Sequence, residues 1–466
     1  MLLTDPDPLI ARIKRDLPPT MPIPSPLQTV ACQRWFFSYI ERCRTRYGSR
    51  FTVYPMDMPP LVFLSDPGDV QEMIAAPPTT LHPGVGGALL APLIGVSSFM
   101  LCEEDAHKLG RNAVMPVFHR KKVVEGYAAM VVEMVEREVA SWPLGTPFAL
   151  HPRVRSLMLR LILRAALVDD DGLLDALHDR LLDSLSVAGS SVVQVAQLRH
   201  LPGWGGMWKR FVKHRSRADE LIFALVRRRR AEAAHGDLLD ALLAASNPDG
   251  SAMTDQQIRD NLMSMVLAGH ETTAAELAWA FQLLAHNRPS QDRLLEELDG
   301  GMGDRYLTAT VDETLRHRPA FPFLIPRAVV EPIAIGGWTY RPPARLLGCT
   351  YLVHHDPELY PEPQTFRPER FLGEVRQAPT WLPWGAGRKS CVGRHFALLE
   401  MQTVLREVLS TRRVLPASAR IERERWRSAV LVPQAGSRVL LQRRSRSSRP
   451  GAHLREPQSP CRARTS

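Results

Sequence analysis

The 466-residue chain lacks the cysteine pattern of a disulfide framework or a zinc site. Its six cysteines are scattered, and none belongs to a C-x-x-C pair: Cys32, Cys43, Cys102, Cys349, Cys391 and Cys461. Long apolar runs are also lacking, since residues 157–168 are interrupted by Arg160 and Arg164. The first residues (M-L-L-T-D-P-D-P) show no basic segment followed by an apolar one. We therefore expect a reduced, cytoplasmic protein without a signal peptide or a transmembrane segment.

Acidic residues are too few to balance the basic ones, and the formal net charge is +10. The excess is concentrated at the C-terminal end, where residues 443–466 contain seven arginines and a single glutamate and so carry six of the ten charges. The remaining +4 is too small for the basic surface of a nucleic-acid-binding protein, so we expect no such partner. With 45% apolar and 23% charged residues, the chain has the composition of an ordinary globular protein.

Proline and turn residues divide the chain into a lead-in, one large domain and a tail. Residues 1–35 are a proline-rich lead-in, in which 17–27 should be extended. Residues 36–441 should form a single domain, mainly α-helical with a small β region, of class α+β. Residues 442–466, rich in Arg, Ser and Pro, should be a disordered basic tail.

Within the domain, the spacing of apolar residues distinguishes strands from helices. Residues 50–64 form two strand-like runs about a proline-containing turn, which predicts a hairpin. Helical spacing dominates the middle of the chain, whereas glycines in 189–208 predict a flexible connector. The clearest helical segments are 123–142, 173–185 and 218–226, and strand-like runs return at 333–353 and 429–441.

Residues 384–393 (W-G-A-G-R-K-S-C-V-G) carry the strongest chemical signal in the sequence. Gly385 and Gly387 allow the backbone to approach a flat ligand closely and to adopt conformations that other residues avoid. Gly393 precedes an apolar helix predicted at 396–408. The segment therefore reads as a tight, glycine-rich loop that leads into a helix.

The loop places Cys391 in surroundings that suit a metal ligand. The positive charges of Arg388 and Lys389 should lower the pKa of the thiol, and the N-terminal dipole of the following helix should favour the thiolate further. A buried, inert thiol is the alternative, and it is the better interpretation of a cysteine without such neighbours.

A second signal lies inside the helical run 261–277, at A-G-H-E-T-T (residues 268–273). A glycine, an acid and two threonines are poor helix formers, and a threonine can bond to the carbonyl one turn earlier and bend the helix. Such a local conflict is typical of a functional segment. A solvated acidic face is the alternative, but the preceding L-M-S-M-V-L predicts burial.

Two pairs of charged residues occur at helical spacing. Glu313 and Arg316 share one helix face, and a second arginine follows in P-E-R-F at 368–371. His107 and Arg111 also share a face and could bind an anion together. Taken singly, the first pair is typical of a surface ion pair and the second of surface cations.

In this order, from about residue 50 to 441, these elements resemble the cytochrome P-450 family, in its soluble bacterial type of haem-thiolate monooxygenase. Residues 384–393 are similar to the family's cysteine-ligand loop, with Trp384 in place of the usual Phe and Lys389 in place of Arg or His. Residues 268–273 are similar to the family's oxygen-activating helix. Residues 341–344 (R-P-P-A) depart from the usual Pro-Gly turn.

The resemblance implies haem b as the cofactor, with Cys391 as the thiolate ligand of its iron. Further cofactor contacts would come from His107, Arg111, Ala268, Arg327, Trp384, Gly385, Lys389 and Gly393. The cations in that set, His107, Arg111, Arg327 and Lys389, would bind the propionates.

The resemblance also assigns roles to residues around the cofactor. Glu271 would supply protons, and Thr272 would hold a water or the bound dioxygen. Ala268 and Gly269 would leave room for the oxygen. A buried cluster of Glu313, Arg316 and Arg370 would fix the cysteine loop.

The implied activity is insertion of one atom of O2 into a hydrophobic small molecule such as a fatty acid, terpenoid or steroid. Pocket walls would come from residues 84–100, the 189–208 connector, Met265, Ala268 and residues 320–325. The protein would be a monomer that receives electrons from a ferredoxin and its NAD(P)H-dependent reductase. Docking is expected at Arg120, Lys121, Lys122, Arg388 and Arg394. Two alternatives stay open: a peroxide-driven peroxygenase, and a haem-based ligand-binding or sensor protein without turnover.

Overall fold

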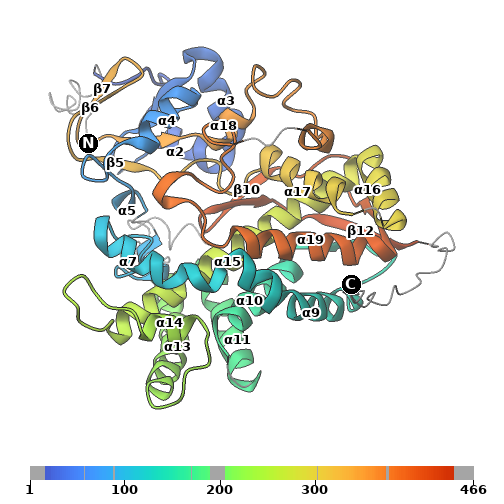
Figure 1. The fold of residues 1–466 in the computed structure, drawn as a ribbon. Coiled ribbons are helices and arrows are strands. Elements are labelled where there is room, and N and C mark those ends of the chain that lie inside the picture. Colours follow the sequence, from blue (N-terminus) through green and yellow to red (C-terminus); the bar gives the residue numbers. More distant parts are fainter. Residues whose placement is uncertain are drawn as a thin grey trace, which may run out of the picture.

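The computed structural model describes residues 16–444 except 57, 88–89, 169–170, 189–204, 302 and 374–376. A helical body and a smaller part that contains most of the strands lie side by side (Figure 1). The longer helices of the body are α7 (Glu104–Val114), α9 (Ala128–Ala140), α10 (His151–Ala166), α11 (Asp171–Ala188), α13 (Gly205–Arg229), α15 (Asp255–His286), α16 (Arg288–Gly300), α17 (Arg305–His317) and α19 (Arg394–Thr411). The mainly helical α+β architecture predicted from the sequence is confirmed.

Shorter helical turns connect these elements. The body contains α5 (Pro83–Gly86), α6 (Ala91–Ile94), a 3-10 turn (Met115–Phe118), α8 (Arg120–Lys122), a π turn (Val123–Tyr127) and α14 (Leu238–Leu243). Two further 3-10 turns, Pro368–Phe371 and Gly387–Lys389, lie in the irregular stretch before α19. Within the described part of the chain, every helix is too short or too polar to cross a bilayer.

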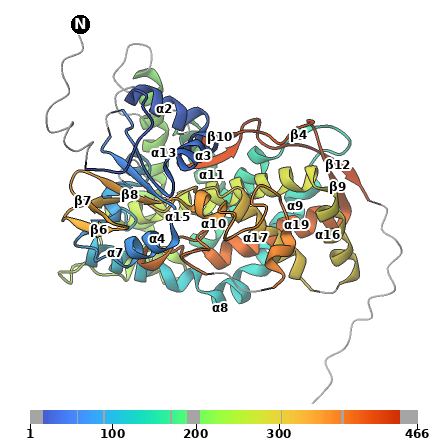
Figure 2. The same cartoon turned by 90° about the horizontal axis from the view of Figure 1, so that it is seen from above.

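Helix α15 forms the centre of the body (Figures 1 and 2). It begins at a capping box, in which the Thr254 hydroxyl accepts from the N–H of Gln257 and the Gln257 side chain accepts from the N–H of Thr254. Of its 32 residues 25 are buried, because helices α10, α13, α14, α16, α17 and α19 and strands β9 and β11 surround it. A side chain on α15 can therefore reach nearly every other part of the molecule.

A five-stranded sheet with the order β1-β2-β8-β5-β3 forms the core of the smaller part. Strands β1 (Arg50–Val53) and β2 (Leu61–Leu64) make the predicted antiparallel hairpin, with Phe51 opposite Phe63. Strand β8 (Arg345–Gly348) runs parallel to β2, and β5 (Arg327–Val329) and β3 (Leu81–His82) complete the sheet in antiparallel fashion. Four helices accompany the sheet: α2 (Ser25–Arg34), α3 (Phe36–Tyr47), α4 (Pro67–Ala75) and α18 (Thr350–His354).

Three smaller sheets use strands from later in the chain. Strands β6 (Ile333–Ile335) and β7 (Trp338–Tyr340) form one hairpin, and β10 (Glu424–Arg427) and β11 (Val430–Pro433) form another that packs on α15. Strand β12 (Arg438–Arg443) lies between β4 (Phe148–Ala149) and β9 (Arg412–Pro416). The predicted return of strand structure near the C-terminus is thus confirmed.

Two boundaries near the chain ends differ from the sequence expectation. Helix α2 begins at Ser25, inside the segment expected to be extended, because Pro26 lies in the first turn, where a helix needs no N–H donor. Strand β12 continues to Arg443, where Gln442 and Arg443 pair with β9, so the ordered chain passes the expected end of the domain. The expected tail from 445 onward lies outside the described residues.

Two internal segments also differ. Residues 350–353 were expected to be a strand but belong to α18. Strands β2 and β8 end side by side, so in the described part of the chain residues 350–353 have no neighbouring strand to pair with. In the predicted connector, residues 189–204 lie outside the described residues, and 205–208 already belong to α13. The two glycines at its start did not prevent helix formation, because Phe211 anchors the next turn in the core.

Candidate functional site

The loop 384–393 lies where two apolar clusters meet. Leu382 and Ala386 belong to the buried cluster beneath the five-stranded sheet, whereas Trp384 and Val392 pack against the large cluster of the helical body. The loop therefore joins the two regions of the fold at their boundary, a position where ligand sites commonly form.

Two glycines give this loop its shape. Gly385 and Gly387 have φ values of +66° and +62°, in the left-handed region that glycine adopts without strain. A Cβ on Gly387 would lie 3.0 Å from Cγ2 of Ile74 on α4, so a side chain there would push against the neighbouring helix. The N–H of Cys391 donates to the carbonyl of Trp384 over 2.7 Å and closes the loop just before α19. The predicted glycine-rich loop is confirmed.

Cys391 is the only exposed residue among the five free cysteines in the described ranges. Desolvation by surrounding protein atoms raises the pKa of its thiol above the ordinary value, although the N–H of Gly393 and the charges of Arg111 and Arg394 act in the opposite direction. The lowered thiol pKa expected from the sequence is therefore not seen in the protein without an added ligand. The charges that favour the thiolate thus come from the adjacent helices rather than from Arg388 and Lys389. No group of three or more His, Cys, Asp or Glu that could hold a metal occurs in the described residues.

Three of the four predicted propionate partners gather around this loop. Arg111 donates from Nη1 to the carbonyl of Ser390 over 2.7 Å. The ring nitrogens of His107 lie 2.8 Å from the carbonyl of Phe99 and 3.3 Å from that of Arg388. Nζ of Lys389 lies 3.0 Å from Nδ1 of His107, and it donates to nearby main-chain carbonyls.

Arg327 reaches the same region from strand β5. Its Nη1 donates to the carbonyls of Met73 and Ile74 at the end of α4, and Ile74 in turn contacts the backbone at Gly387. Burial lowers the pKa of Arg327 to about 10 and that of Lys389 to about 8. Among the described residues, none of the four predicted propionate partners forms an ion pair with a carboxylate, although the charge of Glu103 acts on both Arg327 and Lys389. Arg327 and His107 are buried, and Arg111 and Lys389 are half-buried. Burial lowers the pKa of His107, which therefore acts as a neutral donor. Three cations and an imidazole whose hydrogen bonds go to neutral groups suit an added anion, so this donor set fits a haem with two propionates.

One face of α15 borders accessible space. Between residues 258 and 285 the helix is buried except at Ala268, Gly269 and Thr272, which are half-buried. The Thr272 hydroxyl donates to the carbonyl of Ala268 over 2.6 Å, the back-bond expected of a mid-helix threonine. Gly269 also packs closely on α10, because a Cβ there would lie 2.7 Å from Cγ1 of Ile162. The glycine thus allows α10 and α15 to approach closely, and its expected role in leaving room for oxygen stays a prediction.

Glu271 is turned into a buried basic cluster. Its carboxylate accepts from Nε of Arg155 at 3.0 Å, and it lies 2.8 Å from Nε of Arg427 and 3.2 Å from Nε2 of His270. Although burial opposes ionisation, the hydrogen bond from His270 and the charges of Arg155 and Arg427 hold the pKa of Glu271 well below its usual range. Glu271 is therefore a carboxylate, and Thr272 bonds to the helix rather than to it.

The predicted cluster of Glu313, Arg316 and Arg370 is confirmed and fully packed. Arg316 binds Glu313 through two hydrogen bonds of 2.7 and 2.9 Å, and Nε of Arg370 lies 3.3 Å from the same carboxylate. Arg316 also donates to the carbonyl of His354, whose Nε2 accepts from the N–H of Leu382. Through this chain of contacts the cluster positions the start of the cysteine loop.

Sequence reasoning missed a second set of contacts on α15. Glu276 accepts from the N–H of Ala320 at 2.6 Å, and the carbonyl of Ala320 accepts from the N–H of Leu431 at 3.0 Å. The Leu431 carbonyl in turn accepts from the indole N–H of Trp279, one turn after Glu276. The three elements form a closed, buried ring that fixes Ala320, the first residue of the expected pocket wall at 320–325. Burial raises the pKa of Glu276 to about 8, so it is largely neutral at pH 7. An acid inside the apolar 274–285 run was the available signal.

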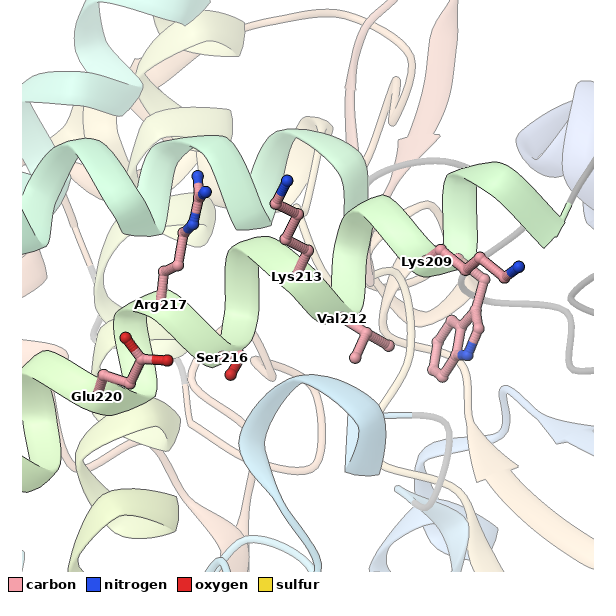
Figure 3. A pocket seen from close by; sticks show the side chains of 7 residues that line it. Lys209, Val212, Lys213, Ser216, Arg217 and Glu220 are labelled. Carbon is pink, nitrogen blue, oxygen red and sulfur yellow. The ribbon is translucent and has the colours of Figure 1, made fainter.

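Two surface grooves lie outside this site. Figure 3 shows one of about 510 Å³ on α13, where Lys213 and Arg217 point to one side and Val212 and Ser216 to the other. Its described lining residues all belong to α13, and none is a predicted site residue. The second groove, of about 660 Å³, runs along the end of α7 and α8, beside Lys121 and Lys122.

Comparison with known proteins agrees with this geometry. The model of the family described as cytochrome P450 matches residues 17–441. The putative cytochrome P450 135B1 of Mycobacterium tuberculosis (strain ATCC 25618 / H37Rv) is 32% identical over 91% of both chains. The putative cytochrome P450 137 of the same strain is 33% identical over 91% of this chain and 90% of that protein.

Solved structures share the fold at lower identity. A cyanobacterial CYP120A1 with bound retinoic acid has a TM-score of 0.79 and 17% identity, covering 92% of this chain and 99% of that one. The haem domain of cytochrome P450DA has a TM-score of 0.80 and 21% identity, covering 93% and 99%. At these identities the likeness concerns the fold alone.

Proposed function

The chain belongs to the cytochrome P450 family of haem-thiolate monooxygenases, and from this premise we propose that Cys391 is its haem ligand. The observation that carries the proposal is the placement of Cys391. Its loop has two left-handed glycines, and around it lie Arg111, Arg327 and Lys389, which form no ion pair with any carboxylate in the described part of the chain. When bound, the haem supplies the activation of dioxygen, for which a thiolate ligand is suited. The chain supplies the ligand, the charge balance, the proton route and the pocket.

His107, Arg111, Arg327 and Lys389 bind the propionates in this proposal. Their present hydrogen bonds go to carbonyls and to Ser390, which are weaker partners than a carboxylate. Exchange of these bonds for charge-assisted ones would compensate the cost of burying Arg327 and Lys389. Trp384, Gly385, Gly393 and Ala268 complete the contacts with the cofactor.

Thr272 and Glu271 form the proton route. Thr272 lies on the open face of α15, so its hydroxyl can leave the Ala268 carbonyl and hold a water in the pocket. Glu271, on the adjacent buried side, stays ionised and accepts protons only transiently. We assign it the role of a relay between the basic cluster and the pocket, not that of a standing proton donor.

The substrate is a hydrophobic small molecule of the fatty acid, terpenoid or steroid class. The walls expected to face it, Met265 and Ala268 on α15, Phe99 in the 84–100 loop and Leu324 in the 320–325 segment, are apolar. A screen of such compounds for spin-state shifts of the haem tests this assignment. Shifts caused only by small polar compounds would overturn it.

The electron donor is a separate ferredoxin with its NAD(P)H-dependent reductase. The protein that receives the electrons is a cytoplasmic monomer. The cations expected at the docking site are all exposed: Arg120, Lys121, Lys122, Arg388 and Arg394. Arg111, which contacts the cysteine loop, lies on α7 directly before Asn112, a residue that lines the second groove. These cations can attract an acidic partner to the cysteine side. Reversal of the three charges of α8 should slow reduction by ferredoxin and leave substrate-induced spectral shifts intact. Unchanged reduction kinetics would contradict the docking site.

Turnover distinguishes the monooxygenase from a peroxygenase. With ferredoxin, reductase and NAD(P)H, product should form and incorporate label from 18O2. Product formed only with hydrogen peroxide would indicate a peroxygenase. Spectral binding without product under either condition would indicate a ligand-binding or sensor protein.

A further inference from the structure

The first third of α15 buries a row of polar residues that the proposed mechanism does not use. Arg259, Asp260, Asn261 and Ser264 are each no more than 2% exposed. A buried polar group lowers the stability of the protein unless it forms a hydrogen bond. The hydrogen-bond partners of these four residues therefore indicate their role.

Three of these residues bind one loop, residues 95–99, through its backbone and one hydroxyl. Asp260 accepts from the N–H of Ser97 at 3.0 Å, and Asn261 accepts from the N–H of Phe99 at 2.9 Å. The hydroxyl of Ser264 shares a hydrogen bond with that of Ser98. Three consecutive residues of the loop are thus each hydrogen-bonded to a side chain of α15.

Gly95 shows how closely the loop fits. It has φ +86°, and a Cβ there would lie only 2.0 Å from the carboxylate of Asp260. The residue at 95 must be glycine for this acid to reach the loop. The contact between Asp260 and the loop is therefore specific in shape as well as in hydrogen bonding.

The loop leads directly to the candidate site. The carbonyl of Phe99 lies 2.8 Å from Nδ1 of His107, and a Cβ on Gly110 would lie 2.5 Å from Cβ of Phe99. Helix α7, which carries His107 and Arg111, is packed onto Phe99 without a gap. The position of the loop therefore sets the position of these two side chains.

A second set of contacts links the same residues to α13. Arg259 binds Asp260 at 2.9 Å and Asp219 of α13 at 2.6 Å. Arg215, one turn before Asp219, donates to the carbonyl of Pro92 at 2.7 Å and lies 3.4 Å from Asp219. Helix α15, helix α13 and residues 92–99 thus form a closed ring held by two arginines and two aspartates.

We propose that Asp260 and Asn261 are positioning residues that clamp residues 95–99 over the pocket, and that the Arg259–Asp219 pair couples this clamp to α13. A bulky ligand reaches the site when the loop and α13 move apart, and the clamp sets how often that happens. The inference rests on the proposed function, because access is observed at the haem. It adds residues that touch neither cofactor nor substrate but control entry and orient His107.

The test compares four variants of the full-length holoprotein. Asn261→Leu removes the acceptor for the Phe99 N–H and keeps a side chain of similar volume. Asp219→Asn weakens the ion pair between Arg259 and α13, and Asp219 is the less buried partner of that pair. Asn261→Asp keeps an acceptor oxygen. The matched control is Gln282→Leu, a fully buried amide on α15 far along the helix from the loop.

Two readouts are measured for each variant. Stopped-flow absorbance follows binding of 4-phenylimidazole, a bulky probe, and of carbon monoxide, a small one. Hydrogen–deuterium exchange follows the peptide that covers residues 95–102. For Asn261→Leu we expect the 4-phenylimidazole association rate to rise about tenfold, as loss of one buried hydrogen bond implies, with a smaller change for carbon monoxide and faster exchange. Asp219→Asn should show the same pattern more weakly, and the other two variants should match the wild type.

Wild-type exchange and azole kinetics in both Asn261→Leu and Asp219→Asn would overturn the clamp. Equal acceleration of both probes would also overturn it, because a clamp discriminates by size. Failure of the proposed function would look different. The wild type itself would then lack a haem-thiolate spectrum, while exchange in the 95–102 peptide would still report whether the loop is held.

Discussion

The carboxylate of Glu271 on α15 and the guanidinium of Arg155 on α10 form a buried ion pair, with 3.0 Å between Oε2 and Nε. Both side chains are at least nine-tenths buried, and Arg427 reaches the same carboxylate from strand β10. The acid is therefore held ionised and in place beside the open face of α15 that carries Thr272. The ionised acid thus lies next in sequence to the half-buried Thr272, whose hydroxyl donates to the Ala268 carbonyl.

Replacement of Glu271 by Gln should lower kcat by about 10²-fold, the lower end of what a positioned acid–base group contributes. The amide fills the same space but cannot accept and release a proton. The ferrous–carbon monoxide spectrum should stay that of the wild type, because the cysteine loop is untouched. Turnover in H2O and D2O measures the effect, and the variant should show a larger solvent isotope effect. Wild-type turnover in Glu271→Gln would remove this residue from the proton route.

Arg427→Met is the informative companion to that variant. Arg155 and His270 would still hold the carboxylate, and Arg427 is the most exposed of the three partners. We expect a smaller loss of kcat than in Glu271→Gln. A larger loss would mean that Arg427, rather than Glu271, is the main element of the relay.

Replacement of Arg370 by Met should lower the free energy of unfolding by about 3 kcal/mol, since one partner of a buried ionic cluster is lost. Arg316 would still bind Glu313, which keeps the effect at the lower end of the usual range. Chemical denaturation measures it. The control is Arg367→Met, whose ion pair with Glu362 is exposed and should contribute less than about 1 kcal/mol. Equal losses in the two variants would show that the cluster is not a special support of the cysteine loop.

Glu276 should make the free energy of unfolding depend on pH at pH values above the ordinary pKa of a glutamate. Its folded pKa is raised from 4.5 to about 8 by burial. As pH rises above 4.5 the unfolded chain loses this proton while the folded chain keeps it, so stability falls until pH passes about 8. Glu276→Gln keeps an oxygen for the Ala320 N–H but does not titrate. Its unfolding free energy should fall less than that of the wild type between pH 5 and pH 8 in denaturation experiments. Parallel curves would contradict the neutral-acid assignment.

The sequence predicted the parts of the site that depend on neighbouring residues. The glycine loop around Cys391 and the back-bonded Thr272 follow from local backbone chemistry, and the structure places both as predicted. The helical, mainly α fold followed from apolar spacing in the same way. Helix ends were predicted less well, as at α13, because core anchors such as Phe211 override local glycines.

Contacts between distant segments were not predictable from the sequence. Arg427 lies 156 positions after Glu271 on a short strand, and no local pattern pairs the two. The close approach of Ile162, on another helix, to Gly269 is a second example. The Asp260 contact with Ser97 likewise depends on how a loop crosses a helix 163 positions later. Tertiary packing decides these positions, and single-sequence periodicity does not report it.

The central claim is that Cys391 provides the thiolate ligand of the haem. The ferrous–carbon monoxide difference spectrum of the wild type, of Cys391→Ser and of Cys102→Ser tests it most directly, because the position of the Soret band reports the axial ligand. Cys102, half-buried near the same loop, is the matched control. We predict the thiolate-type Soret band in the wild type and in Cys102→Ser, and its loss in Cys391→Ser. A thiolate-type band that persists in Cys391→Ser, or that is missing from the wild type, would contradict the account.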